Sequence, residues 1–415
     1  MGAQAAAHRW RAGALALWIA LASAGLAPSV ATARPGDGGR PWVMVDADGR
    51  AAPGDCDARD ATFRRIQDAI DAARDGERIS VCPGRYHEAI RLGGGAQDVY
   101  LVSEDSFRAV IAPPATSTRP AIDIAGAEGV EVRGFRMVLR GRTGPVRLGP
   151  VAVAGTRVCS PAPVGIRVRD ASGVTIRGMR IQADAGCGYA TGIRVVRSSA
   201  RIFTDLVTDF LSRGVVVRAG ADVAIEASDI RFLHARLAEA LPGSTLDDEA
   251  TGLLVDGADA ARIRTVNVFS RVPARDDDLA PVLWVGIDIR DTPGVSIRGD
   301  TVVRRVGRFG IRVTGSDGIA ILNTLVERSY GDAYFLDRVD GGQVVGSDAE
   351  RSLTGFRVGP QVRGVTFRQV RGIRDQLIDC IDQSTGDGTA GTANTWRRSE
   401  GRTSVPSGIC EPADG

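Results

Sequence analysis

A unit of about 22 residues recurs along most of the chain and constrains its fold more than any other feature. Each unit reads glycine–apolar–x–apolar, a five-residue polar corner, apolar–x–apolar and a short third apolar segment, as in VGIRVRDASGVTIRGMRI and VGIDIRDTPGVSIRGDTV. The residues that open successive units are Gly165, Gly192, Gly214, Gly252, Gly286, Gly310, Ala333 and Gly355. Their separations along the chain are 27, 22, 38, 34, 24, 23 and 22, so the minimal unit also accepts insertions. Self-similarity at this period indicates a solenoid.

Two or three short strands per unit are expected, because apolar and polar residues alternate with the period of a half-buried strand. The corners contain Asp170-Ala-Ser-Gly173 and Asp291-Thr-Pro-Gly294, where aspartate accepts local backbone hydrogen bonds and glycine supplies positive φ. A leucine-rich repeat has a similar period, but it would show one strand per unit and leucine at fixed positions. These units are instead rich in β-branched residues and sparse in leucine.

We therefore predict an all-β fold, a parallel β-helix in which each strand pairs with its copy one coil away. One internal column is predicted to contain Ile166, Ile193, Val215, Leu253, Ile287, Ile311 and Phe356. Val174, Val295 and Ile319 are assigned to the next column, and Ile176 and Ile297 should also face inward. Burial of each such side chain contributes about 1.5–3 kcal/mol.

An amphipathic helix is predicted over residues 62–74, TFRRIQDAIDAAR, where it would cover the unpaired strand edges at one end of the stack. Thr62 can cap this helix. The apolar stripe at helical spacing consists of Ile66, Ala69, Ile70 and Ala73.

The helix and the strand after it are followed by Pro83, Gly84, Tyr86 and Glu88, in the pattern Pro-Gly-x-Tyr-x-Glu. This succession resembles the N-terminal part of the pectin-lyase-like right-handed parallel β-helix superfamily. The last cysteine-bounded stretch, 380–410, is also similar to the tails of exported bacterial β-helix proteins. The resemblance covers roughly residues 42–410 and implies the right-handed form of the coil. It does not imply one activity, because the superfamily includes lyases, hydrolases, esterases, epimerases and noncatalytic proteins.

The sequence departs from several enzyme families of this superfamily. It has neither the Gly-His-Gly nor the Arg-Ile-Lys element of polygalacturonases, and it contains no lysine at all. The Gln-Asp-Thr element of pectin methylesterases and the Asp-Pro-His element of alginate epimerases are also absent. Pectate lyases, which use an arginine base and calcium-binding aspartates, remain compatible because their requirement is spatial.

The N-terminal segment 1–33 has the pattern of a secretory signal peptide. His8, Arg9 and Arg11 precede the apolar run GALALWIALASAGLA, and Ala31-Thr-Ala33 supplies a cleavage site. A transmembrane anchor is the alternative, but a run of about 15 residues is short for a span of about 20. Cleavage would leave 50 arginines against 50 acidic residues. Such a balance disfavours nonspecific nucleic-acid binding, and we expect a secreted or otherwise extracytoplasmic monomer without a membrane contact.

The expected organisation is a signal peptide at 1–33, an N-terminal segment at 34–61, the β-helix with its capping helix at 62–379, and a disulfide-clipped tail at 380–415. The cysteines are Cys56, Cys82, Cys159, Cys187, Cys380 and Cys410, and six cysteines allow 15 pairings. Stacked insertions would bring Cys159 to Cys187, and Cys380 with Cys410 would clip the tail. Cys56 and Cys82 then pair by elimination. No Cys/His cluster has the spacing of a structural zinc site.

The large insertions all follow the third strand of a unit and precede the next opening residue. They add 5 residues before Gly192, 16 before Gly252 and 12 before Gly286. Loops inserted at one corner of successive coils stack into a wall that commonly forms the binding side. The stretch 139–164 either enlarges the same corner or contains a further whole coil, since Ala121 and Gly165 lie two unit lengths apart.

Charged and aromatic residues gather at this corner. A Ca²⁺ site is predicted from the acidic loops, with ligands Asp247, Asp248, Asp276, Asp277 and Asp278. Farther along lie Arg304, Arg305, Arg308, Arg328, Tyr330 and Asp332. We assign catalysis to Arg304, Arg308 and Asp332, and substrate contact to Trp284, Tyr330 and Arg328.

A lyase acting on uronic-acid polymers would use Ca²⁺ against the substrate acid and an arginine to take the C5 proton. Paired carboxylates could instead serve hydrolysis, and acidic runs on exposed loops are often merely solvated. His87 and His234 are interpreted as surface or packing histidines, and Trp396 as a capping residue. The sequence thus predicts a protein that binds or processes an extracellular, acidic polysaccharide or cell-envelope glycan. The alternative is a noncatalytic adhesion or envelope-interaction module.

Overall fold

The computed structural model describes residues 42–47, 56, 63–94, 97–114, 117–139, 142–143, 146–148, 151–153, 157–158, 164–183, 189–208, 210–220, 222–232, 250–270 and 283–412. All of them belong to the unit Arg40–Gly415. The signal-peptide segment, Thr62, Cys159, Cys187, His234 and the five predicted calcium ligands lie outside these residues.

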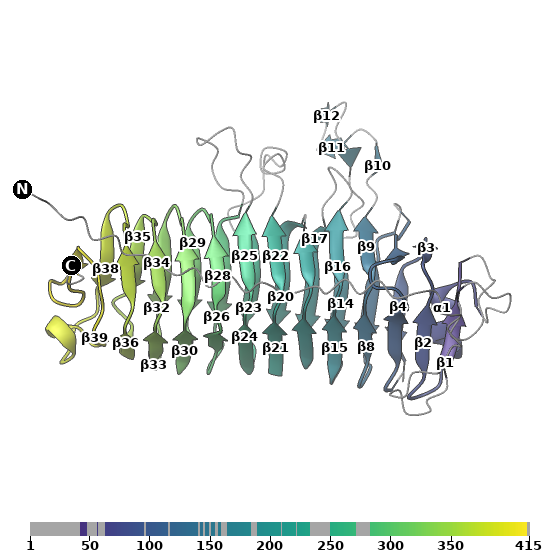
Figure 1. Cartoon of the computed structure of the whole chain (residues 1–415), viewed down its shortest axis with the longest axis horizontal. Coiled ribbons are helices and arrows are strands. Elements are labelled where there is room, and N and C mark those ends of the chain that lie inside the picture. The colour runs from purple at the N-terminus through teal and green to yellow at the C-terminus, as the bar shows by residue number, and fades with distance from the viewer. Residues whose placement is uncertain are drawn as a thin grey trace, which may run out of the picture. The chain divides into compact units, whose positions relative to one another are not determined.

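Three long parallel sheets make up the described unit, and the chain visits them in a fixed order, one strand from each per coil. Figure 1 shows the coils stacked in chain order from purple to yellow. Sheet 1 contains β4 (Ile90–Gly93), β7 (Ile122–Ala125), β14 (Val164–Arg169), β17 (Tyr189–Val196), β20 (Phe210–Arg218), β23 (Thr251–Asp256), β26 (Val285–Arg290), β29 (Phe309–Thr314), β32 (Asp332–Asp337), β35 (Thr354–Val358), β38 (Ile378–Asp382) and β40 (Ser404–Val405).

Sheet 2 contains β1 (Trp42–Val45), β2 (Arg78–Val81), β5 (Tyr100–Ser103), β8 (Glu131–Arg133), β15 (Val174–Arg177), β18 (Ala200–Phe203), β21 (Asp222–Glu226), β24 (Ala260–Arg264), β27 (Ser296–Arg298), β30 (Ile319–Leu322), β33 (Asp340–Val345), β36 (Arg363–Arg368) and β39 (Thr395–Arg397). Sheet 3 contains β3 (Gly84–Tyr86), β6 (Ala109–Ile111), β9 (Arg136–Leu139), β16 (Arg180–Ala183), β19 (Leu206–Thr208), β22 (Asp229–Phe232), β25 (Asn267–Ser270), β28 (Thr301–Arg304), β31 (Thr324–Glu327), β34 (Asp348–Glu350) and β37 (Arg371–Ile373). This is the predicted parallel β-helix, and it excludes the leucine-rich repeat. The coil is right-handed, which is the handedness that connections between parallel strands of one sheet adopt.

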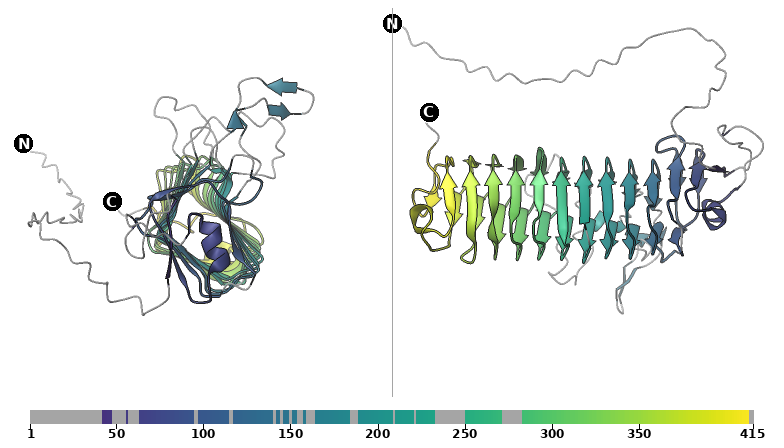
Figure 2. Two further views of the ribbon diagram at one scale, coloured as in Figure 1. Left: turned by 90° about the vertical axis from the view of Figure 1, so that its right-hand side faces the viewer. Right: turned by 90° about the horizontal axis from the view of Figure 1, so that it is seen from below.

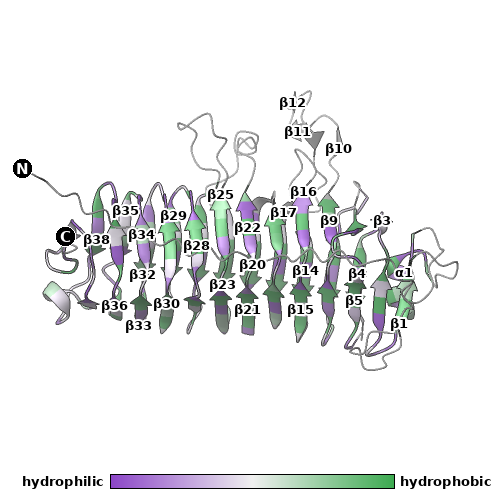
Figure 3. Cartoon of the chain, in the orientation of Figure 1, coloured by the Kyte–Doolittle hydropathy of each residue, from purple (hydrophilic) through white to green (hydrophobic). Residues whose placement is uncertain are grey.

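The predicted internal columns are confirmed by the strand register. Ile166 pairs with Ile193, Ile193 with Val215, and the column continues through Leu253, Ile287 and Ile311, all of them buried. Tyr334 then enters the column between Ile311 and Phe356, and its ring stacks on that of Phe356 at 4.5 Å. Ile176 and Ile297 are fully buried, as predicted. Figure 3 shows the resulting alternation of apolar and polar residues along the strands.

In most units the opening residue is glycine because the sheets approach closely at this position. A Cβ atom on Gly310 would lie 2.3 Å from Val326 Cγ1 and 2.5 Å from the carbonyl oxygen of Ala333 in the next coil. Gly192, Gly252 and Gly286 meet the same two kinds of atom. At Ala333, where the repeat departs from glycine, the register places Ala349 at the position that Val326 occupies one coil earlier. The coil that opens with Ala333, which is larger than glycine, thus has the smaller side chain of Ala349 in sheet 3 where the preceding coil has Val326.

Helix α1 (Ile66–Ala72) forms part of the N-terminal end, and it is shorter than the predicted 62–74. Figure 2 shows it lying across the ends of the three sheets, where Ile66, Ala69 and Ile70 are buried. Its first turn is capped from another coil: Glu88 accepts hydrogen bonds from the backbone N–H groups of Ile66 at 2.8 Å and Gln67 at 3.0 Å. Glu88, the last residue of the Pro-Gly-x-Tyr-x-Glu pattern, therefore has a structural role. Its carboxylate accepts hydrogen bonds from N–H groups in the first turn of the helix, which have no partner within the helix itself.

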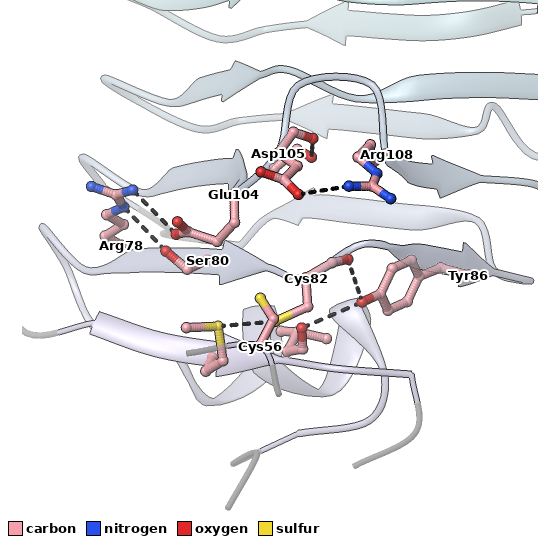
Figure 4. Close-up of a disulfide and its surroundings, with 11 residues drawn as sticks. Cys56, Arg78, Ser80, Cys82, Tyr86, Glu104, Asp105 and Arg108 are labelled. Carbon is pink, nitrogen blue, oxygen red and sulfur yellow. Dashed lines mark hydrogen bonds and ion pairs between the residues drawn. A yellow bond between two sulfur atoms is a disulfide. The ribbon is translucent and has the colours of Figure 1, made fainter. Parts of the chain in front are cut away.

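Two of the three predicted disulfides lie within the described residues, and both are present. Cys56 is bonded to Cys82 (Figure 4), and beside them the Tyr86 hydroxyl donates to the Cys82 carbonyl at 2.9 Å. Cys380 is bonded to Cys410. The pairing of Cys159 with Cys187 stays a prediction.

The tail adds strands to the solenoid. β39 pairs with β36 in sheet 2, and β40 pairs with β38 in sheet 1. A 3₁₀ turn at Thr389–Gly391 lies on the connection from β38 to β39. Trp396 stacks on Phe367 at 4.0 Å and donates its indole N–H to Asp382 at 2.9 Å, so it is the capping residue that the sequence predicts.

The stretch 139–164 places no further coil between β7 and β14 in the stack. β14 pairs directly with β7, Ile166 against Ile122. The described parts of the stretch form two short antiparallel pairs, β10 (Arg142–Thr143) with β13 (Arg157–Val158) and β11 (Val146–Leu148) with β12 (Val151–Val153). Among the helices of the described residues, none is long and apolar enough to cross a membrane.

Candidate active and binding surface

The corner at which each sheet 3 strand turns into the next sheet 1 strand is the one that receives the insertions, and we call it the insertion corner. Three of the predicted site residues stack there on successive coils. The Arg308 N–H donates to the Trp284 carbonyl at 2.8 Å, and the Asp332 N–H donates to the Arg308 carbonyl at 2.9 Å. Tyr330 precedes Asp332 at the same corner and donates its N–H to the Val306 carbonyl at 2.9 Å. The structure therefore brings Trp284, Arg308, Tyr330 and Asp332 together.

The local sequence explains this close stacking. Gly331 stands between Tyr330 and Asp332, and a Cβ atom there would lie 2.2 Å from the Arg308 carbonyl oxygen. Only glycine lets the two coils approach to hydrogen-bonding distance without displacing that carbonyl.

Large apolar side chains are exposed along the insertion corner. Trp284 is 44% exposed, Tyr330 is 53% exposed and Leu377, two coils beyond Tyr330, is 62% exposed. A folded protein normally buries most of a tryptophan or tyrosine ring. Trp284 and Tyr330 lie two coils apart, with Arg308 on the coil between them, and each exposed aromatic face can stack on a ligand ring.

Beside this corner, sheet 1 carries two phenylalanines that the sequence had not singled out, Phe309, which is buried, and Phe335, which is half-buried. The rings of Phe309 and Phe335 lie 4.9 Å apart, and the guanidinium groups of Arg308 and Arg312 lie 4.9 and 5.0 Å from the centre of the Phe309 ring. Each is a cation–π contact. Phe309 and Phe335 could have been found from their positions in the repeat, since both replace smaller or polar residues at outward positions of other units.

The carboxylates on the outer face of sheet 1 are neutralised by arginines of the next coil and, at Asp288, also by an arginine of the same strand. Asp332, which is buried, accepts a hydrogen bond from Arg357 Nε at 2.9 Å. Asp288 is fully buried and receives both Arg312 Nε at 2.8 Å and Arg312 Nη2 at 2.7 Å, together with Arg290 Nε at 2.8 Å. Bidentate pairs of this kind are the strong form of the arginine–carboxylate interaction. They hold Arg312 in a fixed orientation beside Phe309.

Arg304 and Arg328 belong to a second group, centred on Glu327 at the end of β31. The Glu327 carboxylate lies 3.1 Å from Arg304 Nε, 3.6 Å from Arg328 Nε and 3.6 Å from Arg351 Nη1. The three predicted catalytic residues thus contact three different partners: Arg304 pairs with Glu327, Arg308 lies over Phe309, and Asp332 pairs with Arg357.

The predicted calcium ligands cannot be placed, because all five aspartates lie outside the described residues. Across the part of the chain that is described, no group of three or more His, Cys, Asp and Glu side chains is arranged to hold a metal ion. His87 is an exposed residue of the first coils, in agreement with its interpretation as a surface histidine.

Two aspartates buried in the coils have perturbed ionisation. Burial raises the pKa of Asp205 well above its ordinary value, although its Oδ1 accepts the Met179 N–H at 2.6 Å. Burial also raises the pKa of Asp375, to about 8, while a hydrogen bond from the Ser352 N–H opposes the shift and the charges of Asp379 and Glu350 add to it. Asp375 turns inward at the insertion corner and is held chiefly in its protonated form at neutral pH.

No protein-family model matches the sequence, and no curated protein matches it. Solved structures are similar at low sequence identity. The exopolygalacturonase of Thermotoga maritima is 11% identical with a TM-score of 0.47, over 74% of this chain and 82% of that one. The alginate lyase of Paenibacillus sp. str. FPU-7 is 12% identical with a TM-score of 0.36, over 72% of this chain and 95% of that one. The tailspike protein 2 of Escherichia coli O157:H7 bacteriophage CAB120 is 12% identical with a TM-score of 0.42, over 80% of this chain and 43% of that one.

Proposed function

We propose that the protein is exported and binds an extracellular polysaccharide along the insertion corner. The observation that carries the proposal is the stacking of the exposed Trp284 and Tyr330 with Arg308 on successive coils of one corner. Sugar rings present apolar C–H faces, which pack on aromatic rings, and hydroxyl or carboxylate groups, which accept hydrogen bonds from arginine. Export is supported by the two disulfides, since these bonds persist in oxidising compartments.

For the processing of a uronic-acid polymer, we propose β-elimination. Arg304 or Arg308 would take the C5 proton, the electron pair would form the C4–C5 double bond, and the oxygen on C4 would leave with the rest of the polymer. The five predicted aspartates, Asp247, Asp248, Asp276, Asp277 and Asp278, would hold Ca²⁺ against the substrate acid.

A noncatalytic adhesion module is the second candidate, and one observation favours it. Arg304 and Asp332, two of the three residues assigned to catalysis, are already engaged in ion pairs with Glu327 and Arg357. A general base must have a lone pair free for the substrate proton. Binding without cleavage needs no such group.

The test is calorimetric titration of the purified full chain with a panel of acidic and neutral polysaccharides. Trp284→Ala and Tyr330→Ala should each weaken binding roughly tenfold, since one lost stacking contact is equivalent to about 1.4 kcal/mol. Trp42→Ala is the matched control, because Trp42 is 42% exposed but lies on β1 in sheet 2. Binding that weakens equally in the control, or no binding to any polysaccharide, would refute the proposal.

The same polysaccharides separate the two candidates. If the protein is a lyase, we expect the ultraviolet absorbance of an unsaturated product, and Arg304→Ala should abolish this absorbance while binding persists. Binding without absorbance change or new reducing ends is expected of the adhesion module.

A further inference from the structure

Four arginines occupy one position of the insertion corner on four consecutive coils. They are Arg305, Arg328, Arg351 and Arg374, each one repeat unit after the last, and we call them the arginine ladder. Their φ angles are 57°, 59°, 53° and 58°, and backbone hydrogen bonds join Arg305 to Glu327, Arg328 to Glu350 and Arg351 to Ile373 in the next coil. All four side chains are exposed. The ladder is therefore a straight row of cations along the solenoid.

The backbone does not explain the choice of arginine. Positive φ is the left-handed region, which glycine and asparagine adopt most readily. The corner between sheets 2 and 3 makes a turn of the same φ with several residue types, among them Gly178, Thr204, Ala227, Asn323 and Gly346. At the insertion corner, by contrast, every residue of positive φ within the described coils is an arginine.

Electrostatics within the chain do not explain it either. Like charges on adjacent coils repel one another, since strands in a sheet are about 4.8 Å apart. Glu327 lies 3.6 Å from both Arg328 and Arg351, which it partly neutralises. The two outer members, Arg305 and Arg374, make no ion pair or side-chain hydrogen bond with any of the residues that the structure describes. A strained, self-repelling and partly unpaired row of cations is suited to an external anion.

We propose that the arginine ladder binds a linear polysaccharide with one acid group on each sugar residue, and that the polymer runs along the solenoid axis. This inference rests on the proposed function and specifies its ligand. The coil repeat of about 4.8 Å is close to the advance per residue of an extended pyranose chain, so successive acid groups meet successive arginines. Nucleic acid fits less well, because its phosphates follow at about 3.4 Å per strand. Trp284 and Tyr330 border the ladder on the same corner, where they would stack on the sugar rings.

The test compares two double variants that remove the same charge from the same backbone conformation. Arg305→Gln/Arg374→Gln removes the unpaired ends of the ladder. Arg338→Gln/Arg398→Gln is the control, because Arg338 and Arg398 also have positive φ but lie at other corners. Calorimetry measures their affinities for uronic-acid oligomers of increasing length at two salt concentrations, together with the carboxyl-reduced neutral oligomers and duplex DNA.

The ladder variant should bind the acidic oligomers about tenfold more weakly than the wild type, and the control should bind like the wild type. Affinity should rise with oligomer length until four sugar residues are reached, and it should fall with salt less steeply in the ladder variant. Equal effects of the two double variants, equal affinity for the neutral oligomers, or equal affinity for DNA would overturn the inference. If neutral oligomers bind as tightly as acidic ones and Trp284→Ala weakens that binding, the proposed function is supported and the inference about the arginine ladder is refuted. If no glycan binds at all, both the proposed function and the inference are refuted.

Discussion

Replacing Gly310 by alanine should destabilise the solenoid by about 3 kcal/mol or more, since overpacking a well-packed core costs about 1–3 kcal/mol before any backbone clash is added. The new Cβ would lie 2.3 and 3.0 Å from the two methyl carbons of Val326 and 2.5 Å from the Ala333 carbonyl oxygen. The carbonyl adds to the cost, because it belongs to the backbone of the next coil and cannot rotate away as a side chain can.

The assay is denaturant unfolding of the purified protein, with Gly294→Ala as the matched control. Gly294 has a φ of 62°, and a Cβ atom there would meet no atom within 4 Å, so alanine reports conformational strain alone, about 1 kcal/mol. Adding Val326→Ala to Gly310→Ala should recover part of the loss, because Ala349 takes the place of Val326 in the coil that opens with Ala333. If Gly310→Ala unfolds at the same denaturant concentration as Gly294→Ala, the close approach between sheets is not what selects glycine.

Three further predictions concern the crosslink, the buried acid and the cation. Replacing Cys380 and Cys410 by serine should lower the free energy of unfolding by about 3–4 kcal/mol, because their bond closes a loop of 30 residues; equal stability of the oxidised wild type and the variant in denaturant titrations would contradict this. The pKa of Asp375 is raised in the fold to about 8, so the folded protein keeps this proton at pH values where the unfolded chain has lost it. The resulting contribution to the free energy of unfolding is complete below about pH 4. It is lost as the pH rises to about 8, at up to about 1.4 kcal/mol per pH unit. Asp375→Asn should remove that slope from unfolding curves measured over about pH 5–8, and an unchanged slope would show that Asp375 is ionised in the fold. Millimolar Ca²⁺, but not Mg²⁺, should raise the melting temperature, and Asp277→Ala should abolish the effect. If calorimetry detects no Ca²⁺ binding, the acidic residues of these loops are solvated surface residues and not metal ligands.

The fold could be predicted because its signal is periodic. Each inward column repeats in every coil, so the assignment of a residue such as Ile176 can be checked against the equivalent residues of the coil before and the coil after it. Local ends were less predictable. The helix begins at Ile66 because its first N–H groups are capped by Glu88 from 22 residues away, a contact that no local pattern reveals.

The candidate site could be located but not assembled from the sequence. Insertions marked the corner, and the corner does bring Trp284, Arg308 and Tyr330 together. The partners of the charged residues depend on the register between coils: the Asp332 carboxylate accepts a hydrogen bond from Arg357, whereas the Asp332 backbone N–H bonds to Arg308. Such contacts follow from three-dimensional pairing, so the sequence named candidate residues but not the partners that their side chains contact.

The central claim, that the insertion corner binds the polysaccharide, is tested most directly by hydrogen exchange of the full chain with and without a uronic-acid polymer. We expect slower exchange of backbone amides in the corner segments 304–309, 328–332 and 351–354, with little change on sheet 2. Protection confined to sheet 2, or distributed evenly over all three sheets, would contradict it.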